Sequence, residues 1–518
     1  MRLSTSAARR RLAWLRRAAA AGTLTLAMLQ GTDARAQAPT PASDEFRVNT
    51  ITESFQLSPA VAADADGDFT VVWTGGPDGY DLSVGAQRYT TDGTPQGEEF
   101  QVNTATQGFQ AEPAIAMAGD GAFVVVWSSE FQDGDSFGAY AQRYAADGAP
   151  QGEEFQVNTT TADIQFAYSV GVDAAGGFVI AWQGNVDESQ NVYVRRYGAD
   201  GTPLSEEVQV NTVSAADPVR ASLGVAPGGD FVVAWQSEGQ DGDGFGIFAR
   251  RYGADGAPLG EEFQVNTTTA GDQARPSVGV DADGTALVVW DSDGLDGSGT
   301  GIVARRFAAD GTPLGDEFQV NTFTEDDQVE ADVDVSADGS AVVVWQSQGQ
   351  DGSGTGIYAQ RYAADGTPAG PELEVNTTTD NDQARPSVSS DADGDFVVVW
   401  DSRDQDGDGT GIYARRYAVN PVAIENDAAL PTALALEAAY PNPARDAATL
   451  RYALPTAADV HVTVTDLLGR TVLSRTEGAK PAGRHAVQLT LDGLSSGVYV
   501  VRVNAQGATA TERLTVVR

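Results

Sequence analysis

The sequence lacks cysteine altogether and holds only two histidines and one lysine. Without cysteine it can form no disulfide, thiolate metal site, thiol nucleophile or cysteine-linked lipid anchor. His461, His485 and Lys480 all lie near the C-terminus, so the long stretch before them offers no histidine for a zinc site, a triad or general base catalysis. No stretch reaches the roughly 18 consecutive apolar residues of a membrane-spanning helix, and we expect no transmembrane segment in the mature chain.

Positive charge is also scarce. Acidic residues outnumber basic ones by 73 to 32, which gives a formal net charge of −41. A surface of this charge repels phosphate backbones and anionic lipid headgroups, which argues against nucleic-acid and membrane-surface partners. It favours cations, neutral sugars or basic proteins as partners. Hydrophobic residues make up 41% of the chain, enough to bury a core.

The N-terminus has the features of a secretory signal peptide. Five arginines between Arg9 and Arg17 form a basic region, and a short apolar run follows from Ala18 to Leu29. Ala36-Gln37-Ala38 then offers the small residues of a cleavage site. The pattern predicts that residues 1–38 are a signal peptide and that the protein is exported.

Three residue types recur with a single period along most of the chain. An asparagine in Val-Asn-Thr returns every 53 to 55 residues, and a tryptophan and an arginine before an aromatic residue keep the same spacing. A period shared by independent residue types indicates tandem copies of one supersecondary unit. The positions are Asn49, Asn103, Asn158, Asn211, Asn266, Asn321 and Asn376; Trp73, Trp127, Trp182, Trp235, Trp290, Trp345 and Trp400; and Arg88, Arg143, Arg196, Arg251, Arg306, Arg361 and Arg416.

Each repeat is expected to contain four short antiparallel strands. In the last one, residues 384–390 are extended, and residues 396–400 are apolar at every position, as in a strand buried on both faces. A Gly/Asp loop at 404–411 and a third strand at 412–417 follow, and earlier repeats add a fourth strand, as at 317–321. Four strands in about 54 residues are typical of a propeller blade, whose apolar faces are buried between neighbouring blades.

The phase of the repeats predicts how the ring closes. A fourth-strand sequence, residues 45–49, precedes the first tryptophan strand, while the last repeat ends at Tyr417 without a fourth strand of its own. We therefore predict an all-β chain with a closed seven-bladed β-propeller at 44–418, in which the N-terminal strand completes the last blade and removes an open edge. An open β-solenoid is the alternative. These units resemble the tandem Gln-Val-Asn-Thr, Gln-Asp-Gly and Gln-Arg-Tyr repeats of large secreted bacterial proteins, a resemblance that implies a surface setting but no defined activity.

Composition changes after the repeats. Residues 419–436 are expected to be a linker, and residues 437–518 alternate apolar and polar positions, as in a small Ig-like β-sandwich. The motifs there are Tyr440-Pro441-Asn442-Pro443, Asp466-Leu467-Leu468-Gly469-Arg470, Gly483-Arg484-His485 and Leu494-Ser495-Ser496-Gly497-Val498-Tyr499. In this order they resemble the type A C-terminal sorting domain of the type IX secretion system.

That resemblance implies passage across the outer membrane of a Gram-negative bacterium through the type IX secretion machinery. The cargo is then released or attached to the cell surface. A plain Ig-like adhesive domain is the alternative for this segment.

Aspartate-rich turns are the candidate metal sites. Calcium prefers oxygen ligands, and alternating carboxylates around a glycine turn supply several of them. Other repeats lose these acids, so a simple Asp-Gly hairpin turn is the competing interpretation. The candidate calcium ligands are Asp64, Asp66, Asp68, Asp281, Asp283, Asp391, Asp393 and Asp395.

The remaining repeated residues are expected to be structural. Each tryptophan ends an apolar strand, so packing between blades is favoured over a sugar-stacking platform. The repeated arginine is expected to pair with a carboxylate or stack on the adjacent aromatic ring.

The sequence identifies no catalytic residue. It favours a secreted surface binding or adhesion protein that presents loops to a glycan or a surface protein. The alternative is a secreted carbohydrate-active enzyme that uses a carboxylate pair. Residues 160–200, the most divergent repeat, are the first place to look for such a pair.

Overall fold

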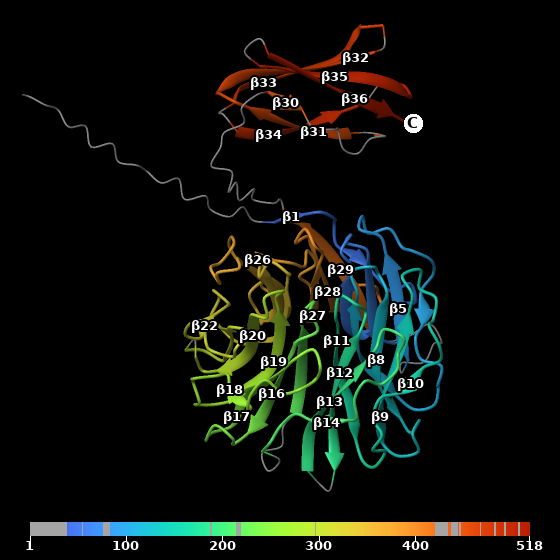
Figure 1. The fold of residues 1–518 in the computed structure, drawn as a ribbon, viewed down its shortest axis with the longest axis vertical. Coiled ribbons are helices and arrows are strands. Elements are labelled where there is room, and N and C mark those ends of the chain that lie inside the picture. The colour runs from blue at the N-terminus through green and yellow to red at the C-terminus, as the bar shows by residue number, and fades with distance from the viewer. Residues whose placement is uncertain are drawn as a thin grey trace, which may run out of the picture. The chain divides into compact units, whose positions relative to one another are not determined.

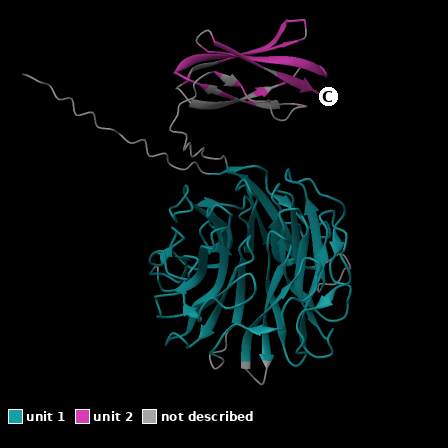
Figure 2. Ribbon diagram, in the orientation of Figure 1, with its two compact units in different colours: residues 1–420 teal, residues 421–518 magenta. Residues whose placement is uncertain are grey.

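The computed structural model describes residues 39–53, 55–75, 83–186, 189–213, 219–295, 297–419, 434–436, 444, 447–466, 468–480, 483–491, 494–505 and 508–517. The chain divides into two compact units, residues 1–420 and 421–518 (Figure 2). Within the described ranges the regular structure is entirely β, so the all-β prediction is confirmed and no helix suited to crossing a membrane is found there. The predicted signal peptide and most of the predicted linker lie outside the described residues.

The first unit contains seven antiparallel sheets, one for each sequence repeat (Figure 1). Sheets 1 to 7 begin with β3 (Leu57–Ala63), β7 (Gln110–Met117), β11 (Gln165–Val172), β15 (Val219–Val225), β19 (Gln273–Val280), β23 (Gln328–Val335) and β27 (Gln383–Ser390). Their second strands are β4 (Phe69–Thr74), β8 (Phe123–Glu130), β12 (Phe178–Val186), β16 (Phe231–Glu238), β20 (Ala286–Asp293), β24 (Ala341–Gln348) and β28 (Phe396–Arg403).

The outer strands complete these sheets. The third strands are β5 (Val84–Tyr89), β9 (Phe137–Tyr144), β13 (Ser189–Tyr197), β17 (Phe245–Tyr252), β21 (Thr300–Phe307), β25 (Thr355–Tyr362) and β29 (Thr410–Ala418). The fourth strands of sheets 1 to 6 are only two residues long: β6 (Phe100–Gln101), β10 (Phe155–Gln156), β14 (Val208–Gln209), β18 (Phe263–Gln264), β22 (Phe318–Gln319) and β26 (Leu373–Glu374). In sheet 7, β1 (Thr40–Pro41) and β2 (Phe46–Arg47) pair with β29 instead.

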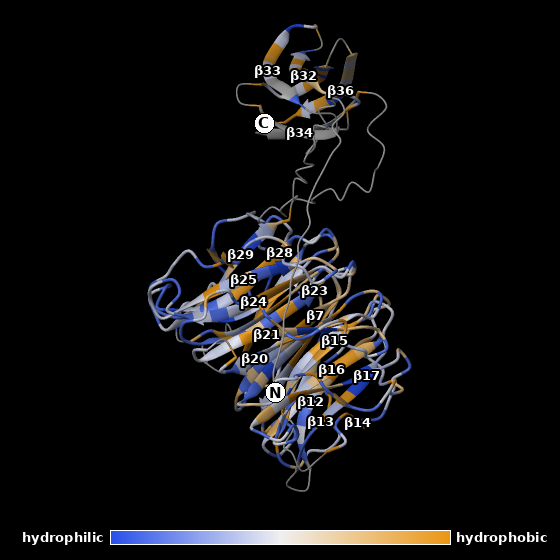
Figure 3. Cartoon of the chain, turned by 90° about the vertical axis from the view of Figure 1, so that its left-hand side faces the viewer, coloured by the Kyte–Doolittle hydropathy of each residue, from blue (hydrophilic) through white to orange (hydrophobic). Residues whose placement is uncertain are grey.

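The core lies between neighbouring sheets. Val72 of sheet 1 and Trp127 of sheet 2 belong to one apolar cluster, and the same kind of cluster recurs between the following sheets. All seven repeated tryptophans are at most 1% exposed, so they are core residues and cannot stack on a ligand. Figure 3 shows that most of the hydrophobic colour follows the strands. Gly85 is required beside one of these rings, because a Cβ there would lie 2.7 Å from Trp73.

The repeated asparagines tie the fourth-strand position to the third strand. Asn103 Oδ1 accepts the N–H of Val84 at 2.8 Å, and the corresponding bond occurs in every sheet. In sheet 7 the asparagine comes from the N-terminal segment, where Asn49 Oδ1 accepts the N–H of Ile412 at 2.7 Å. In sheet 1 this bond joins residues that are 19 apart in the sequence. In sheet 7 the same bond joins residues that are 363 apart.

A repeated glutamate joins each sheet to the next. The N–H of Thr104 donates to Glu154 Oε2 at 2.6 Å, and the N–H of Thr377 donates to Glu45 Oε2 at the same distance. The first strands follow the same cyclic order, since each contacts the first strand of the next sheet and β27 contacts β3. Contacts between sheets 7 and 1 therefore repeat those between the other sheets.

The repeated arginines have a different partner from the predicted one. Arg88 donates to the carbonyl oxygen of Asp147 at 2.7 Å, and Arg143 donates to that of Asp200 at 2.7 Å. These acceptors are main-chain atoms in the turn between the third and fourth strands of the next sheet. For Arg88 and Arg143 the prediction of a carboxylate or an aromatic partner was wrong, because their guanidinium groups donate to main-chain carbonyl oxygens of the next sheet.

The second unit has two sheets. One consists of β30 (Ala435–Leu436), β31 (Ala447–Leu454) and β34 (Gly483–Thr490), and the other of β32 (Ala458–Asp466), β33 (Thr471–Lys480), β35 (Gly497–Ala505) and β36 (Ala508–Val516). A single apolar cluster joins Leu450 of the first sheet to Val462 and Val501 of the second. The two sheets thus bury one face each, as the alternating pattern of β32 requires.

Candidate functional site

A channel with a cavity volume of about 880 Å³ lies among the first strands of all seven sheets. In each sheet the first strand pairs only with the second, so its other edge faces the channel. One end of the lining is formed by the turns after the first strands, including Asp64 and Asp391, and is called the turn mouth. The other end includes Glu112, Arg275 and Arg385 and is called the bulge mouth.

Small polar side chains satisfy the channel edges of these strands. Ser169 Oγ accepts the N–H of Leu223 at 3.2 Å, and Ser389 Oγ accepts the N–H of Ala63 at 3.0 Å. Each bond runs from one first strand to the next. Because a buried main-chain N–H is costly without a partner, these side chains stabilise the ring from inside.

Two aspartates break the sevenfold regularity of this lining. Both are on β23 and both are half-buried: Asp332 and Asp334. The positions that match Asp332 in the other sheets are Ala60, Ala114, Ser169, Ser222, Ser277 and Ser387, and those that match Asp334 are Ala62, Ala116, Gly171, Gly224, Gly279 and Ser389. Carboxylates therefore replace the small residues only in sheet 6.

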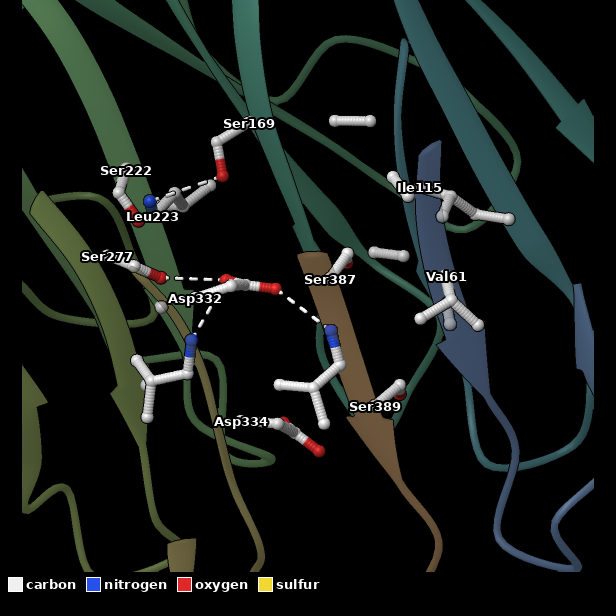
Figure 4. Close-up of a pocket in the computed structure, with 18 of the residues that line it drawn as sticks. Val61, Ile115, Ser169, Ser222, Leu223, Ser277, Asp332, Asp334, Ser387 and Ser389 are labelled. Atoms are coloured by element: carbon white, nitrogen blue, oxygen red, sulfur yellow. Dashed lines mark hydrogen bonds between the residues drawn. The ribbon is translucent and has the colours of Figure 1, made fainter. Parts of the chain in front are cut away.

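Both aspartates bond to the neighbouring strands. Asp332 accepts a hydrogen bond from Ser277 Oγ at 2.9 Å and one from the N–H of Val388 at 3.1 Å, as Figure 4 shows. Asp334 accepts the N–H of Ser390 at 2.6 Å. Each carboxylate thus accepts a main-chain N–H of β27, just as serine hydroxyls accept N–H groups of other first strands.

Burial among the first strands raises the pKa of both carboxyls. Desolvation is the main cause in each case, and the hydrogen bonds from main-chain N–H groups oppose it. The pKa of Asp334 rises to about 6, and Asp332 lies close enough to contribute by repulsion. A carboxyl with this pKa exchanges its proton near neutral pH. Asp334 is therefore a candidate for proton transfer in the channel.

The bulge mouth is built by a repeated β-bulge in the first strand. The pairing shifts there in each sheet, as between Ala274 and Ser277 in sheet 5. The bulged residue has a left-handed backbone in six sheets: Ser58, Glu112, Arg220, Arg275, Glu330 and Arg385. All six line the channel, and all but Ser58 carry a charged side chain.

Two of these arginines are already paired. Arg275 contacts Asp291 at 2.6 Å, and Arg385 contacts Asp401 at 2.6 Å. Both aspartates follow a core tryptophan and are nearly inaccessible, at 1% and 3% exposure, and burial raises the pKa of each to about 6. Asp291 also accepts the N–H of Glu330 in the next sheet at 3.1 Å. Each pair lies within one sheet, and its aspartate also accepts a main-chain N–H of the next sheet, so the arginines have little freedom to bind an anion.

The predicted calcium ligands lie in three separate turns that follow first strands, and two of them, Asp64 and Asp391, line the turn mouth. Asp64, Asp281 and Asp391 each accept two main-chain N–H bonds on Oδ1, for example from Asp66 and Asp68 at 3.0 and 2.9 Å. Asp66, Asp283 and Asp393 are exposed, whereas Asp68 and Asp395 accept further N–H bonds from Thr91 and Val419. Within the described residues no three acidic or histidine side chains are arranged to hold a metal ion. Calcium binding stays a prediction.

Sequence reasoning missed the channel aspartates. It pointed to residues 160–200, where Gln183 bonds to Gln190 and no comparable carboxylate pair faces the channel among the residues described in that stretch. The signal for Asp332 and Asp334 was present in the repeats: aligned column by column, only sheet 6 has acids at two positions that are otherwise Ala, Ser or Gly. Without the structure, nothing marked those columns as facing a channel.

Comparison with known proteins identifies the C-terminal segment. Residues 438–517 match the secretion system C-terminal sorting domain. The sequence prediction of such a domain is thereby confirmed, although its Tyr440 to Pro443 motif lies outside the described residues. The chain is a substrate of the type IX secretion machinery of a Gram-negative bacterium and reaches the outer surface or the medium. No curated protein matches the chain.

Several solved structures resemble parts of the chain. A protein of unknown function from Dyadobacter fermentans is 12% identical, with 72% of this chain and 97% of that one covered and a TM-score of 0.45. PorZ, a surface component of the type IX secretion system of Porphyromonas gingivalis, is 16% identical over 88% and 59%, with a TM-score of 0.40. An α-L-arabinanase from Penicillium chrysogenum is 11% identical over 69% and 92%, with a TM-score of 0.39. At these values none of them assigns an activity to this chain.

Proposed function

We propose that residues 44–418 form a closed seven-bladed β-propeller and that residues 437–518 form an Ig-like sandwich. The cyclic series of bonds supports closure, because Asn49 and Glu45 make in sheet 7 the bonds that Asn103 and Glu154 make within the ring. A closed ring also places each apolar sheet between two neighbours, and sheets 7 and 1 share an apolar cluster as the other neighbours do.

We further propose that the exported protein is a surface or extracellular binding and adhesion protein, with a glycan or a surface protein as its partner. One observation carries this proposal. The two carboxylates that break the symmetry of the channel hold β27 through its main-chain N–H groups, so their acceptor atoms serve the fold. Catalysis would require these atoms to be free to exchange protons with a substrate.

The test measures binding and product release on the same samples. The full chain is incubated with insoluble xylan, crystalline cellulose and collagen-coated beads, and co-sedimentation and new reducing ends are measured. We expect co-sedimentation with at least one of these without new reducing ends. The Asp334→Asn variant should bind equally well, because its amide oxygen still accepts the N–H of Ser390. Failure to bind all three would contradict the proposal.

A second candidate function, a carbohydrate-active enzyme, is favoured by the position of the two aspartates. Two residues apart on β23, their side chains leave the same face of the strand at a spacing of about 7 Å, which falls within the range of inverting glycosidases. The raised pKa of Asp334 suits a general acid. Release of reducing ends that is lost in Asp334→Asn would establish this function in place of the first.

Calcium binding by the turn mouth is kept as a separate proposal. The proposed ligands are the eight aspartates named above. The thermal melt is measured in about 1 M salt, which screens the net charge of the protein. With calcium at a hundredfold excess over its dissociation constant, a bound site stabilises the fold by about 2.7 kcal/mol relative to chelator. We expect a rise with calcium that magnesium does not reproduce. An equal rise in melting temperature with both ions would show that these residues only form turns.

A further inference from the structure

Exposed aromatic side chains gather on one side of the bulge mouth. Phe55, Phe109 and Phe131 are 52%, 46% and 63% exposed, and all lie in loops at this end of sheets 1 and 2. Next to them, Phe137 of sheet 2 and Phe166 of sheet 3 are half-buried against each other, with ring centroids 4.9 Å apart. These five residues are called the phenylalanine rim.

The rim is confined to sheets 1 to 3. The positions of sheets 5 to 7 that match Phe55 and Phe109 hold Asp272, Asp327 and Asp382. Asp272 and Asp327 accept main-chain N–H bonds there, from Phe245 and Thr300. An acid that caps a loop in one half of the ring is thus replaced by an exposed phenyl ring in the other half.

The backbone at Phe131 is the second independent observation. Its φ is +62°, a left-handed conformation that bulky L-residues avoid because of the clash at Cβ. The matching residues of sheets 4, 5 and 6 are Gly239, Gly294 and Gly349, with φ of +69°, +68° and +72°. The chain therefore keeps a strained phenylalanine where three of its repeats use glycine and the last uses Asp404, with a φ of +58°, and an exposed ring regains little of that cost by packing.

The segment around Phe131 and Phe109 is held in place by its own hydrogen bonds. The N–H of Glu130 donates to the carbonyl of Phe109 at 2.7 Å, and that of Phe131 donates to the carbonyl of Ser136 at 2.6 Å. Glu130 Oε2 accepts the N–H of Phe109 at 3.2 Å. The two rings are therefore presented from a fixed loop pair, which limits the entropy lost when a ligand is bound.

The charge around the rim selects the kind of ligand. Its neighbours Glu112, Glu130, Asp133 and Asp135 are all acidic, in a chain of net charge −41. Carboxylates accept hydrogen bonds from hydroxyl groups and repel anions. Separate phenyl rings with acceptors between them match a pyranose chain, in which apolar C–H faces alternate with hydroxyl-bearing edges. A protein partner is the other occupant, and the test below separates it from a sugar.

We propose that the phenylalanine rim binds a neutral pyranose oligosaccharide by stacking of its sugar rings on Phe109 and Phe131. This rests on the proposed binding function and names its ligand class. Acidic polysaccharides are disfavoured by the carboxylates beside the rings, and of the three arginines of the bulge mouth, Arg275 and Arg385 are paired with Asp291 and Asp401.

The test is calorimetric titration of the full chain with cellohexaose, xylohexaose, mannohexaose and, for comparison, hexagalacturonate. We expect binding of at least one neutral hexasaccharide and none of hexagalacturonate. Phe131→Gly should weaken that binding by roughly tenfold, since it removes the stacking ring. It should leave the melting temperature unchanged or higher, because glycine accepts the left-handed φ without strain.

Two further variants separate the explanations. Phe109→Ala should weaken binding in the same way, whereas Leu314→Ala, an equally exposed apolar residue of the turn after β21 at the opposite end of the strands, should leave it unchanged. The inference is overturned if no neutral hexasaccharide binds, if hexagalacturonate binds instead, or if both phenylalanine variants bind as well as the parent. Continued co-sedimentation with collagen in those cases would leave the binding function intact and refute only this ligand class.

Discussion

Deleting residues 44–50 from the full chain is expected to cause a large loss of stability. The deletion removes β2 from sheet 7, together with Val48, which is 2% exposed and contributes roughly 2 kcal/mol by burial. It also removes the bonds of Asn49 to Ile412 and of Glu45 to Thr377, at about 1 kcal/mol each. We expect a loss of roughly 5 kcal/mol in the free energy of unfolding, measured by urea denaturation.

A matched pair of point variants makes the same test without a deletion. Asn49 bonds to Ile412, Ile51 and Gln56, and Asn103 makes the same three kinds of bond to Val84, Ala105 and Gln110. If the ring is closed in solution, Asn49→Ala and Asn103→Ala should lower the melting temperature equally. If Asn103→Ala lowers the melting temperature and Asn49→Ala does not, the N-terminal strand does not close the ring. That result would favour the open solenoid.

The second large effect is a gain in stability on mild acidification. Asp291, Asp401 and Asp334 have pKa values raised to about 6 by burial, well above the usual value of 3.8. The folded protein therefore binds protons more tightly than the unfolded chain at these sites. Their stabilisation is complete below the unfolded pKa and is lost as the pH rises through about 6.

The size of this effect follows from the two nearly inaccessible groups. A shift of about two pKa units corresponds to roughly 3 kcal/mol for Asp291 and for Asp401. Urea unfolding of the full chain should give a higher free energy of unfolding at pH 5 than at pH 7. Below pH 4.5 the trend should reverse, because hydrogen bonds lower the pKa of Glu45 and Glu317 in the folded state.

Variants assign the pH effect to particular residues. Asp334→Asn removes a titrating group without removing the acceptor for the N–H of Ser390, so it should flatten part of the slope between pH 5 and 7. Asp66→Asn, at an exposed turn position, should not change that slope. Stability that falls between pH 7 and pH 5 in the parent protein would contradict the assignment of raised pKa values to these buried groups.

Much of the architecture could be predicted from local sequence. Runs such as Phe396 to Trp400 are apolar on both faces and bounded by Asp-Gly turns, which specifies a buried strand without knowledge of its neighbours. The sorting domain could be recognised because its motifs are contiguous in the chain. The four-stranded sheets and the C-terminal domain were therefore within reach of the sequence.

The arginine partners and the channel carboxylates were not within reach, because each depends on atoms of another sheet. Arg88 meets a carbonyl at Asp147, and Asp332 meets an N–H at Val388, each more than fifty residues away. The phenylalanine rim likewise combines loops and strand ends of three sheets, and the exposure of its rings follows from the packing of those sheets.

The amino-acid sequence by itself determined the repeat, the strands and the export route, because these depend on periodicity and on motifs within short segments. Only the tertiary structure decided which side chains of β23 face the channel, which oxygen atoms are already engaged and which rings remain exposed. The physical reason is that a strand alternates its side chains between two faces. Local sequence sets that alternation, but the packing of distant sheets determines what each face meets.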